Sequence, residues 1–71
     1  MNNKPKRTLF FDNYPEAKLA LGQVTFPVVI KPCGITNPDY YYKVKNYGEA
    51  VTVLYDAFEY SKNNWVEIEF F

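Results

Sequence analysis

The chain has 71 residues, with eight basic and eight acidic side chains and no histidine, so its formal net charge is zero. This length allows one small domain, and the charge balance argues against a general nucleic-acid or membrane-surface binder, because both depend on a basic surplus. Hydrophobic residues make up 48% of the chain and aromatic residues 20%, so we expect a folded core rather than disorder.

The single cysteine, Cys33, cannot form an internal disulfide, which favours a reducing, cytoplasmic setting. No apolar run approaches the roughly 20 residues of a membrane span. The polar, basic start of the chain also lacks the apolar segment of a signal peptide. We therefore expect a cytoplasmic protein without a membrane partner, in which residues 1–7 form a disordered tail and residues 8–71 a single domain.

The first half of this domain has the pattern of a strand, a helix and a strand. Residues 8–11 form a short strand candidate. A helix follows Asn13, which can cap the first free amides; the glutamate three residues later completes a capping box, and Gly22 ends the helix. The β-branched run at 26–31 predicts a strand that ends at Pro32, because proline cannot continue a ladder.

The second half repeats this order. Residues 32–39 form a loop rich in turn-forming residues, and a strand is expected over 40–45. The next helix begins at Asn46 with the same capping residues, shows apolar residues at helical spacing, and is expected to end at 63–64. Residues 65–71 alternate apolar and acidic side chains, which predicts the last strand.

The order of elements, βαββαβ, predicts an α+β fold. We expect a four-stranded antiparallel sheet with two helices on one face, in the split-βαβ, ferredoxin-like arrangement. The sequence Asn-Tyr-Pro-Glu-Ala at 13–17 recurs as Asn-Tyr-Gly-Glu-Ala at 46–50. This recurrence fits either an internal duplication or two helices that use the same cap.

Alternation along the strands separates the two faces of the predicted sheet. If the apolar side chains lie under the helices, Val29 and Tyr41 lie on the opposite, open face among four charged residues. These are Lys31, Lys43, Glu67 and Glu69. A cation for phosphate, an acceptor for an exocyclic amine and an apolar surface are what a nucleotide requires. A solvated, salt-bridged sheet face has the same pattern, and spacing alone leaves both interpretations open.

Four sequence blocks carry a family resemblance. They are Phe-Pro-Val-Val-Ile-Lys-Pro at 26–32, Tyr-Lys-Val-Lys-Asn at 42–46, Glu-Ala at 49–50 and Val-Glu-Ile-Glu-Phe-Phe at 66–71. In order and spacing they resemble the ATP-grasp superfamily, and more narrowly its carbamoyl-phosphate-synthase-like and carboxylate–amine ligase branch. The resemblance covers residues 10–71 and implies the small lid subdomain that closes over ATP.

The resemblance also implies which residues bind ATP. Lys31 matches the family's lysine that contacts the phosphates and base, and Glu69 matches the glutamate that receives the adenine amine. Lys43, on the same face, is a further candidate. Gly34 is another candidate. The loop at 33–41 matches the family's glycine-rich loop, which covers the β- and γ-phosphates, and Gly34 is its one glycine. The second acidic position of the last strand is occupied by Phe70.

In the family, a larger subdomain supplies the Mg²⁺ ligands, the acceptor site and the other wall of the ATP cleft. We expect those groups to come from outside these 71 residues, and we expect no catalytic or metal-binding residue within them. Cys33 has no histidine partner that would activate a thiol. The chain alone is expected not to catalyse a reaction, although the resemblance is to ATP-dependent ligases.

Two functions remain open. In the first, the chain is the ATP-binding lid subdomain, as a fragment or remnant, of an ATP-grasp carboxylate–amine or thiol ligase, and the large subdomain is its partner. In the second, it is a non-catalytic module that kept the fold and binds a protein or a second copy of itself through the tyrosines at 40–42 or the sheet face. An RNA-binding sheet of the same order is disfavoured, because the basic and aromatic strand motif of that class is absent.

Overall fold

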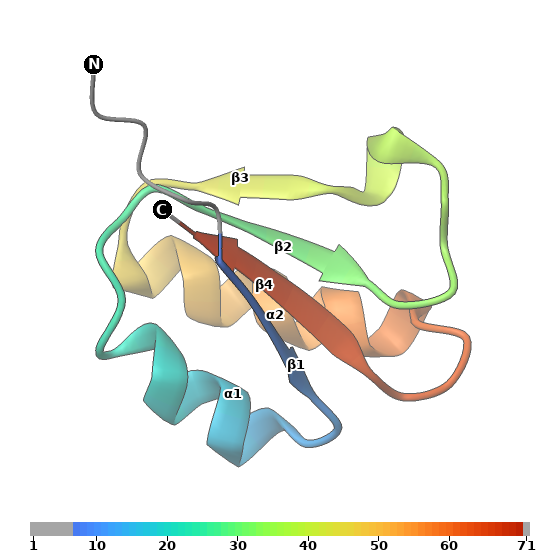
Figure 1. Ribbon diagram of the computed structural model, residues 1–71, viewed down its shortest axis with the longest axis horizontal. Coiled ribbons are helices and arrows are strands. Elements are labelled where there is room, and N and C mark those ends of the chain that lie inside the picture. The colour runs from blue at the N-terminus through green and yellow to red at the C-terminus, as the bar shows by residue number, and fades with distance from the viewer. Residues whose placement is uncertain (1–6, 71) are drawn as a thin grey trace.

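The structure is a computed structural model that describes residues 7–70. The elements along the chain are β1 (Arg7–Phe11), α1 (Tyr14–Leu21), β2 (Val28–Pro32), the 3₁₀ helix η1 (Pro38–Tyr40), β3 (Tyr42–Val44), α2 (Tyr47–Tyr60) and β4 (Val66–Phe70). The two α-helices pack on one face of a four-stranded antiparallel sheet (Figure 1). The predicted α+β fold is confirmed.

The strands lie in the order β1-β4-β2-β3, and each neighbouring pair is antiparallel. β4 therefore lies between β1 and β2, the two strands joined by α1. In the same way β2 lies between β3 and β4, the two strands joined by α2. Each βαβ unit is split by a strand of the other, and β2 and β4 form the centre of the sheet.

Both helices begin at the asparagine caps that the sequence predicts. The Asn13 Oδ1 accepts a hydrogen bond from the Glu16 amide at 2.9 Å, and the Asn46 Oδ1 accepts one from the Glu49 amide at the same distance. At the second cap, the Glu49 carboxylate accepts from the amide of Lys45 at 3.2 Å. The caps satisfy amides that have no partner within the helix.

The core lies between the helices and the sheet. Its residues are at most 1% exposed: Ala17, Leu21, Val28, Ile30, Val44, Ala50, Leu54, Ala57, Val66 and Ile68. Full burial of a valine, leucine or isoleucine contributes about 1.5–3 kcal/mol, so this layer dominates the stability of the domain. In β2 the core residues alternate with partly exposed ones, whereas in β4 Glu69, on the opposite face, is itself only 8% exposed. The predicted apolar faces of the central strands are confirmed, because Val28, Ile30, Val66 and Ile68 all lie in the core.

The predicted strand over 40–45 is wrong at its start. The Asn37 Oδ1 accepts from the Asp39 amide at 3.0 Å and caps η1, so Tyr40 belongs to that short helix and Tyr41 follows it as a connection. The strand β3 itself has only three residues. Local capping by asparagine therefore overrides the strand propensity of the tyrosines.

Other boundaries differ by a few residues. β1 begins at Arg7, which the sequence analysis assigned to the tail, and β2 runs from Val28 to Pro32 instead of 26–31. The helix α2 ends at Tyr60 rather than 63–64, because Ser61 is extended, with φ −64° and ψ 146°. Residues 1–6 of the predicted tail and the last residue of the predicted strand 65–71 lie outside the described residues.

The loop after β2 is attached to the loop before β4. The Lys62 amide donates to the Cys33 carbonyl at 2.9 Å, and the Cys33 amide donates to the Trp65 carbonyl at 3.0 Å. Gly34 has φ +84°, and a Cβ built on it would lie 2.6 Å from the Lys62 Cβ. Both the backbone conformation and this close approach require glycine here.

We expect Gly34→Ala to destabilise the domain by about 1–3 kcal/mol, because alanine must adopt a positive φ and displace the loop at Lys62. Gly48→Ala is the matched control, since a Cβ there would meet its nearest neighbour, the Asn46 Oδ1, at 3.6 Å. That control should be neutral or stabilising by up to about 1 kcal/mol. Urea denaturation measures both; equal stability of the two variants would contradict the structural role of Gly34.

Candidate functional site

Strand register arranges the open face of the sheet in two rows. From β3 to β1 the first row consists of Lys43, Val29, Glu69 and Thr8. The second row, from β2 to β1, consists of Lys31, Glu67 and Phe10. The prediction that the two lysines and the two glutamates emerge on one face is therefore confirmed.

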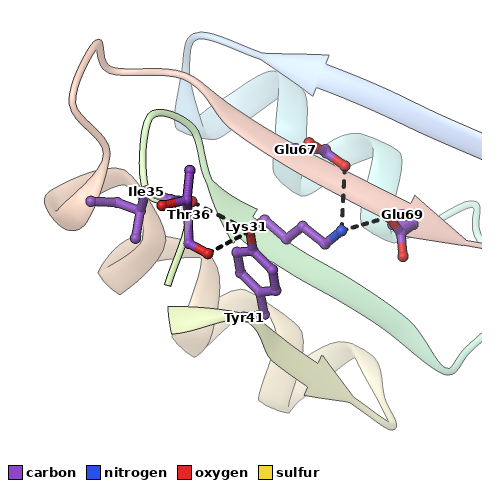
Figure 2. Close-up of polar contacts among 6 residues, drawn as sticks. All are labelled: Lys31, Ile35, Thr36, Tyr41, Glu67 and Glu69. Atoms are coloured by element: carbon purple, nitrogen blue, oxygen red, sulfur yellow. Dashed lines mark hydrogen bonds and ion pairs between the residues drawn. The ribbon is translucent and has the colours of Figure 1, made fainter. Parts of the chain in front are cut away.

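Lys31 is the centre of an ion-pair cluster (Figure 2). Its Nζ lies 2.7 Å from the Glu69 Oε2 and 3.8 Å from the Glu67 Oε2. The exposed fractions of the side chains are 20% for Lys31, 11% for Glu69 and 24% for Glu67, so the cluster is largely shielded from water. The hydrogen bond to Glu69 is the main cause that raises the pKa of Lys31 above its ordinary value, against the opposing effect of burial.

Tyr41 contacts the same ammonium from another side (Figure 2). The Lys31 Nζ lies 4.8 Å from the centroid of the Tyr41 ring, within the range of a cation–π contact. The Tyr41 hydroxyl donates to the carbonyls of Ile35 and Thr36, at 3.4 Å each. Tyr41 thereby connects the loop after β2 to the ion-pair cluster.

The other two predicted binding residues lie farther from this cluster. Lys43 is exposed and is separated from Glu69 by Val29 in its row. Gly34 lies in the loop and packs against Lys62. Of the four candidates, the structure thus brings Lys31 and Glu69 into direct contact and leaves Lys43 and Gly34 at the periphery.

Cys33 directly follows the last residue of β2, Pro32, and is half-buried. Burial, with a smaller effect of Glu67, raises the pKa of its thiol above the ordinary value. The thiol is therefore protonated at neutral pH, which makes it a poor nucleophile.

Sequence reasoning missed a hollow on the helix side of the molecule, where the start of α1 meets the end of α2. It is lined by Glu59 and by the aromatic rings of Tyr14, Tyr55 and Phe58. The centroid of the Tyr14 ring lies 6.2 Å from that of Tyr55 and 6.5 Å from that of Phe58. The lining residues are scattered in sequence, so no local motif indicates them. The hollow and the Lys31 cluster lie on different sides of the sheet.

Within residues 7–70, no group of three or more His, Cys, Asp or Glu side chains could hold a metal ion. In the same range, no helix is long and apolar enough to cross a bilayer.

No protein-family model matches the chain, and neither does any curated protein. The chemistry of the open face is therefore the basis for a functional interpretation.

We expect Lys31→Met to destabilise the domain by about 1–3 kcal/mol, because it removes the ammonium that contacts two shielded carboxylates. This range lies between the values for exposed and for buried ion pairs. Lys43→Met, on the same face but exposed, should change the free energy of unfolding by less than about 0.5 kcal/mol. Urea denaturation compares the two variants. An equal effect of both would show that the cluster does not contribute to stability.

Alkaline pH should destabilise the domain. Lys31 has a folded-state pKa raised above 10.5, so the stability from its ion pairs is present below that pH and is lost as pH rises through the folded value. Burial is also the main cause that raises the thiol pKa of Cys33 above 9.0 and the hydroxyl pKa of Tyr42 above 10.0. As the pH rises, both groups therefore ionise in the unfolded chain before they ionise in the folded one.

The urea midpoint should consequently be flat from about pH 7 to 8.5 and fall between about pH 9 and 11. Cys33→Ser should remove the earliest part of this fall. If the urea concentration at the midpoint increased as the pH rose above 9, the assigned directions of the pKa shifts would be contradicted.

Proposed function

We propose that the open face is half of an adenine-nucleotide site and that the chain acts as the lid subdomain of an ATP-grasp-type ligase. One observation carries the proposal: the Lys31 ammonium and the Glu69 carboxylate lie side by side at 2.7 Å on this face. They are the two residues for which the family resemblance implies contacts with ATP.

The pair has the chemistry that an adenine edge requires. Adenine presents N7 as an acceptor beside its N6 amine as a donor, and side-chain amides of Asn and Gln bind this edge with a neighbouring donor and acceptor. An ammonium has three donors and a carboxylate about four lone-pair sites, so each group can bind a ligand in addition to its partners within the chain. Glu69 would accept from the N6 amine, and Lys31 would donate to N7 or to the nearest phosphate.

Neighbouring side chains on the open face fit the remainder of a nucleotide. Val29 lies beside Glu69 in its row and offers an apolar contact, and the Tyr41 ring lies against the ammonium. Stacking of a base on an aromatic ring contributes about 1–3 kcal/mol. Lys43, at the end of the same row, offers an exposed cation for a phosphate.

The distribution of the resembling blocks supports the ATP-grasp assignment. The blocks at 26–32, 42–46 and 66–71 include the strands β2, β3 and β4, which carry three of the four candidate residues, Lys31, Lys43 and Glu69. In this proposal Mg²⁺ and the reacting groups are bound by a larger subdomain outside this chain. The chain itself positions ATP and does not catalyse the ligation.

A second candidate function is association with a protein, and exposed apolar groups favour it. Leu9 and Phe10 on the edge strand β1 are 40% and 56% exposed, and Trp65 is 39% exposed. The tyrosines at 40–42 do not form one exposed strand, because Tyr40 packs on Tyr60 at 5.1 Å between ring centroids. An interaction through β1 would add a strand to an unpaired sheet edge.

An amide-resolved NMR titration of the chain with Mg-ATP tests the first function. We expect a dissociation constant of about 1 mM, as suits half of a site, with shifts at Lys31, residues 33–41 and Glu69. Lys31→Ala should remove most of the binding, whereas Tyr41→Ala should weaken it less.

Equal affinity in the wild type and in Lys31→Ala would contradict the role of Lys31. A well-dispersed spectrum without shifts would reject the nucleotide site and favour the second function. Sedimentation of the wild type and Phe10→Ser would then show whether the chain associates with itself through β1.

A further inference from the structure

We propose that this site recognises the adenine base and gains little from the phosphates, so that adenosine, AMP and Mg-ATP bind with similar affinity. This inference rests on the proposed adenine-nucleotide site. It concerns which part of the nucleotide the described residues of this chain can bind, and it follows from the charges and the backbone around Lys31.

The charge of Lys31 is already compensated within the chain. Its ammonium lies between the carboxylates of Glu69 and Glu67, at 2.7 and 3.8 Å, so the three groups together carry one negative charge. A phosphate beside Lys31 would also lie beside these two carboxylates. Lys43, the second lysine that the described strands place on this face, is exposed, and an exposed ion pair contributes little to affinity.

Half of the amides in the loop that follows β2 already donate within the chain. A phosphate-binding loop presents several successive amides to the ligand. Pro38 has no amide N–H, and four of the other residues at 33–41 already donate theirs within the chain. The Cys33 amide donates to the Trp65 carbonyl and the Asp39 amide to the Asn37 Oδ1. The Tyr40 amide donates to the Asn37 carbonyl and the Tyr41 amide to the Pro38 carbonyl.

The middle of the loop directs oxygens, not amides, toward the site. The carbonyls of Ile35 and Thr36 accept from the Tyr41 hydroxyl, and Figure 2 shows both oxygens directed toward it. In a trans peptide the amide N–H is opposite to the carbonyl, so the N–H groups of Thr36 and Asn37 point away from Tyr41. Later in the same loop, the first turn of η1 carries the carboxylate of Asp39, which repels an anion.

The base, in contrast, has a specific partner. Inosine carries a carbonyl oxygen where adenosine carries the N6 amine, and this oxygen would face the Glu69 carboxylate without a proton between them. A buried polar group left without its partner produces strong discrimination. The site should therefore bind inosine at least about tenfold more weakly than adenosine.

NMR titrations of the full chain with adenosine, AMP, Mg-ATP and inosine at one ionic strength test the inference. We expect dissociation constants within about threefold of each other for the three adenine ligands, and at least about tenfold weaker binding for inosine. Mg-ATP binding more than about tenfold tighter than adenosine would overturn the inference and leave the proposed nucleotide site intact. Inosine binding as tightly as adenosine would also overturn it.

If none of the four ligands shifts the amides of Lys31 and Glu69, the proposed function fails together with the inference. Glu69→Gln tests the base contact separately, because a glutamine can also donate to a carbonyl oxygen. It should reduce the preference for adenosine over inosine to less than about threefold, while Glu59→Gln, on α2, should keep the wild-type preference. An unchanged preference in a dispersed Glu69→Gln spectrum would remove Glu69 from the base contact.

Discussion

The register of β2 against β4 determines both the core and the candidate site. In this antiparallel pair Ile30 lies opposite Ile68, and Lys31 lies opposite Glu67. Because side chains alternate between the two faces, a shift of one residue would move Lys31 under the helices and Ile30 into solvent. An unpaired ammonium in the core is very costly. The ladder that buries the apolar residues thus also brings the lysine to the carboxylates.

The sequence predicts those features that depend on local patterns. Alternation along the strands placed the charged residues on the open face, and Asn13 and Asn46 predicted the helix starts, because capping is a local interaction. The direct contact of Lys31 with Glu69 was not predictable, since it is a diagonal contact that requires the register between distant strands. The approach of Lys62 to the loop after β2 depends on tertiary structure in the same way.

The ion-pair cluster explains how a chain without net charge could bind a nucleotide. Lys31, Glu67 and Glu69 offer a donor and acceptors within a few ångströms, but the cluster as a whole is not cationic. Such a site suits hydrogen bonding to a base better than neutralisation of a triphosphate. In the proposed role as a lid subdomain, binding of the phosphates would then depend on the larger subdomain and its metal ions, while this chain would determine the orientation of the base.

The central claim is that the adenine base lies on the open face beside Lys31 and Glu69. Intermolecular NOEs between bound adenosine and the chain test it most directly, because the H8 proton of adenine is adjacent to N7. With the base in this position, NOEs are expected from H8 to the methyl groups of Val29, which lies opposite Glu69. NOEs from H8 to Tyr14 and Phe58, in the hollow on the helix side, would contradict it.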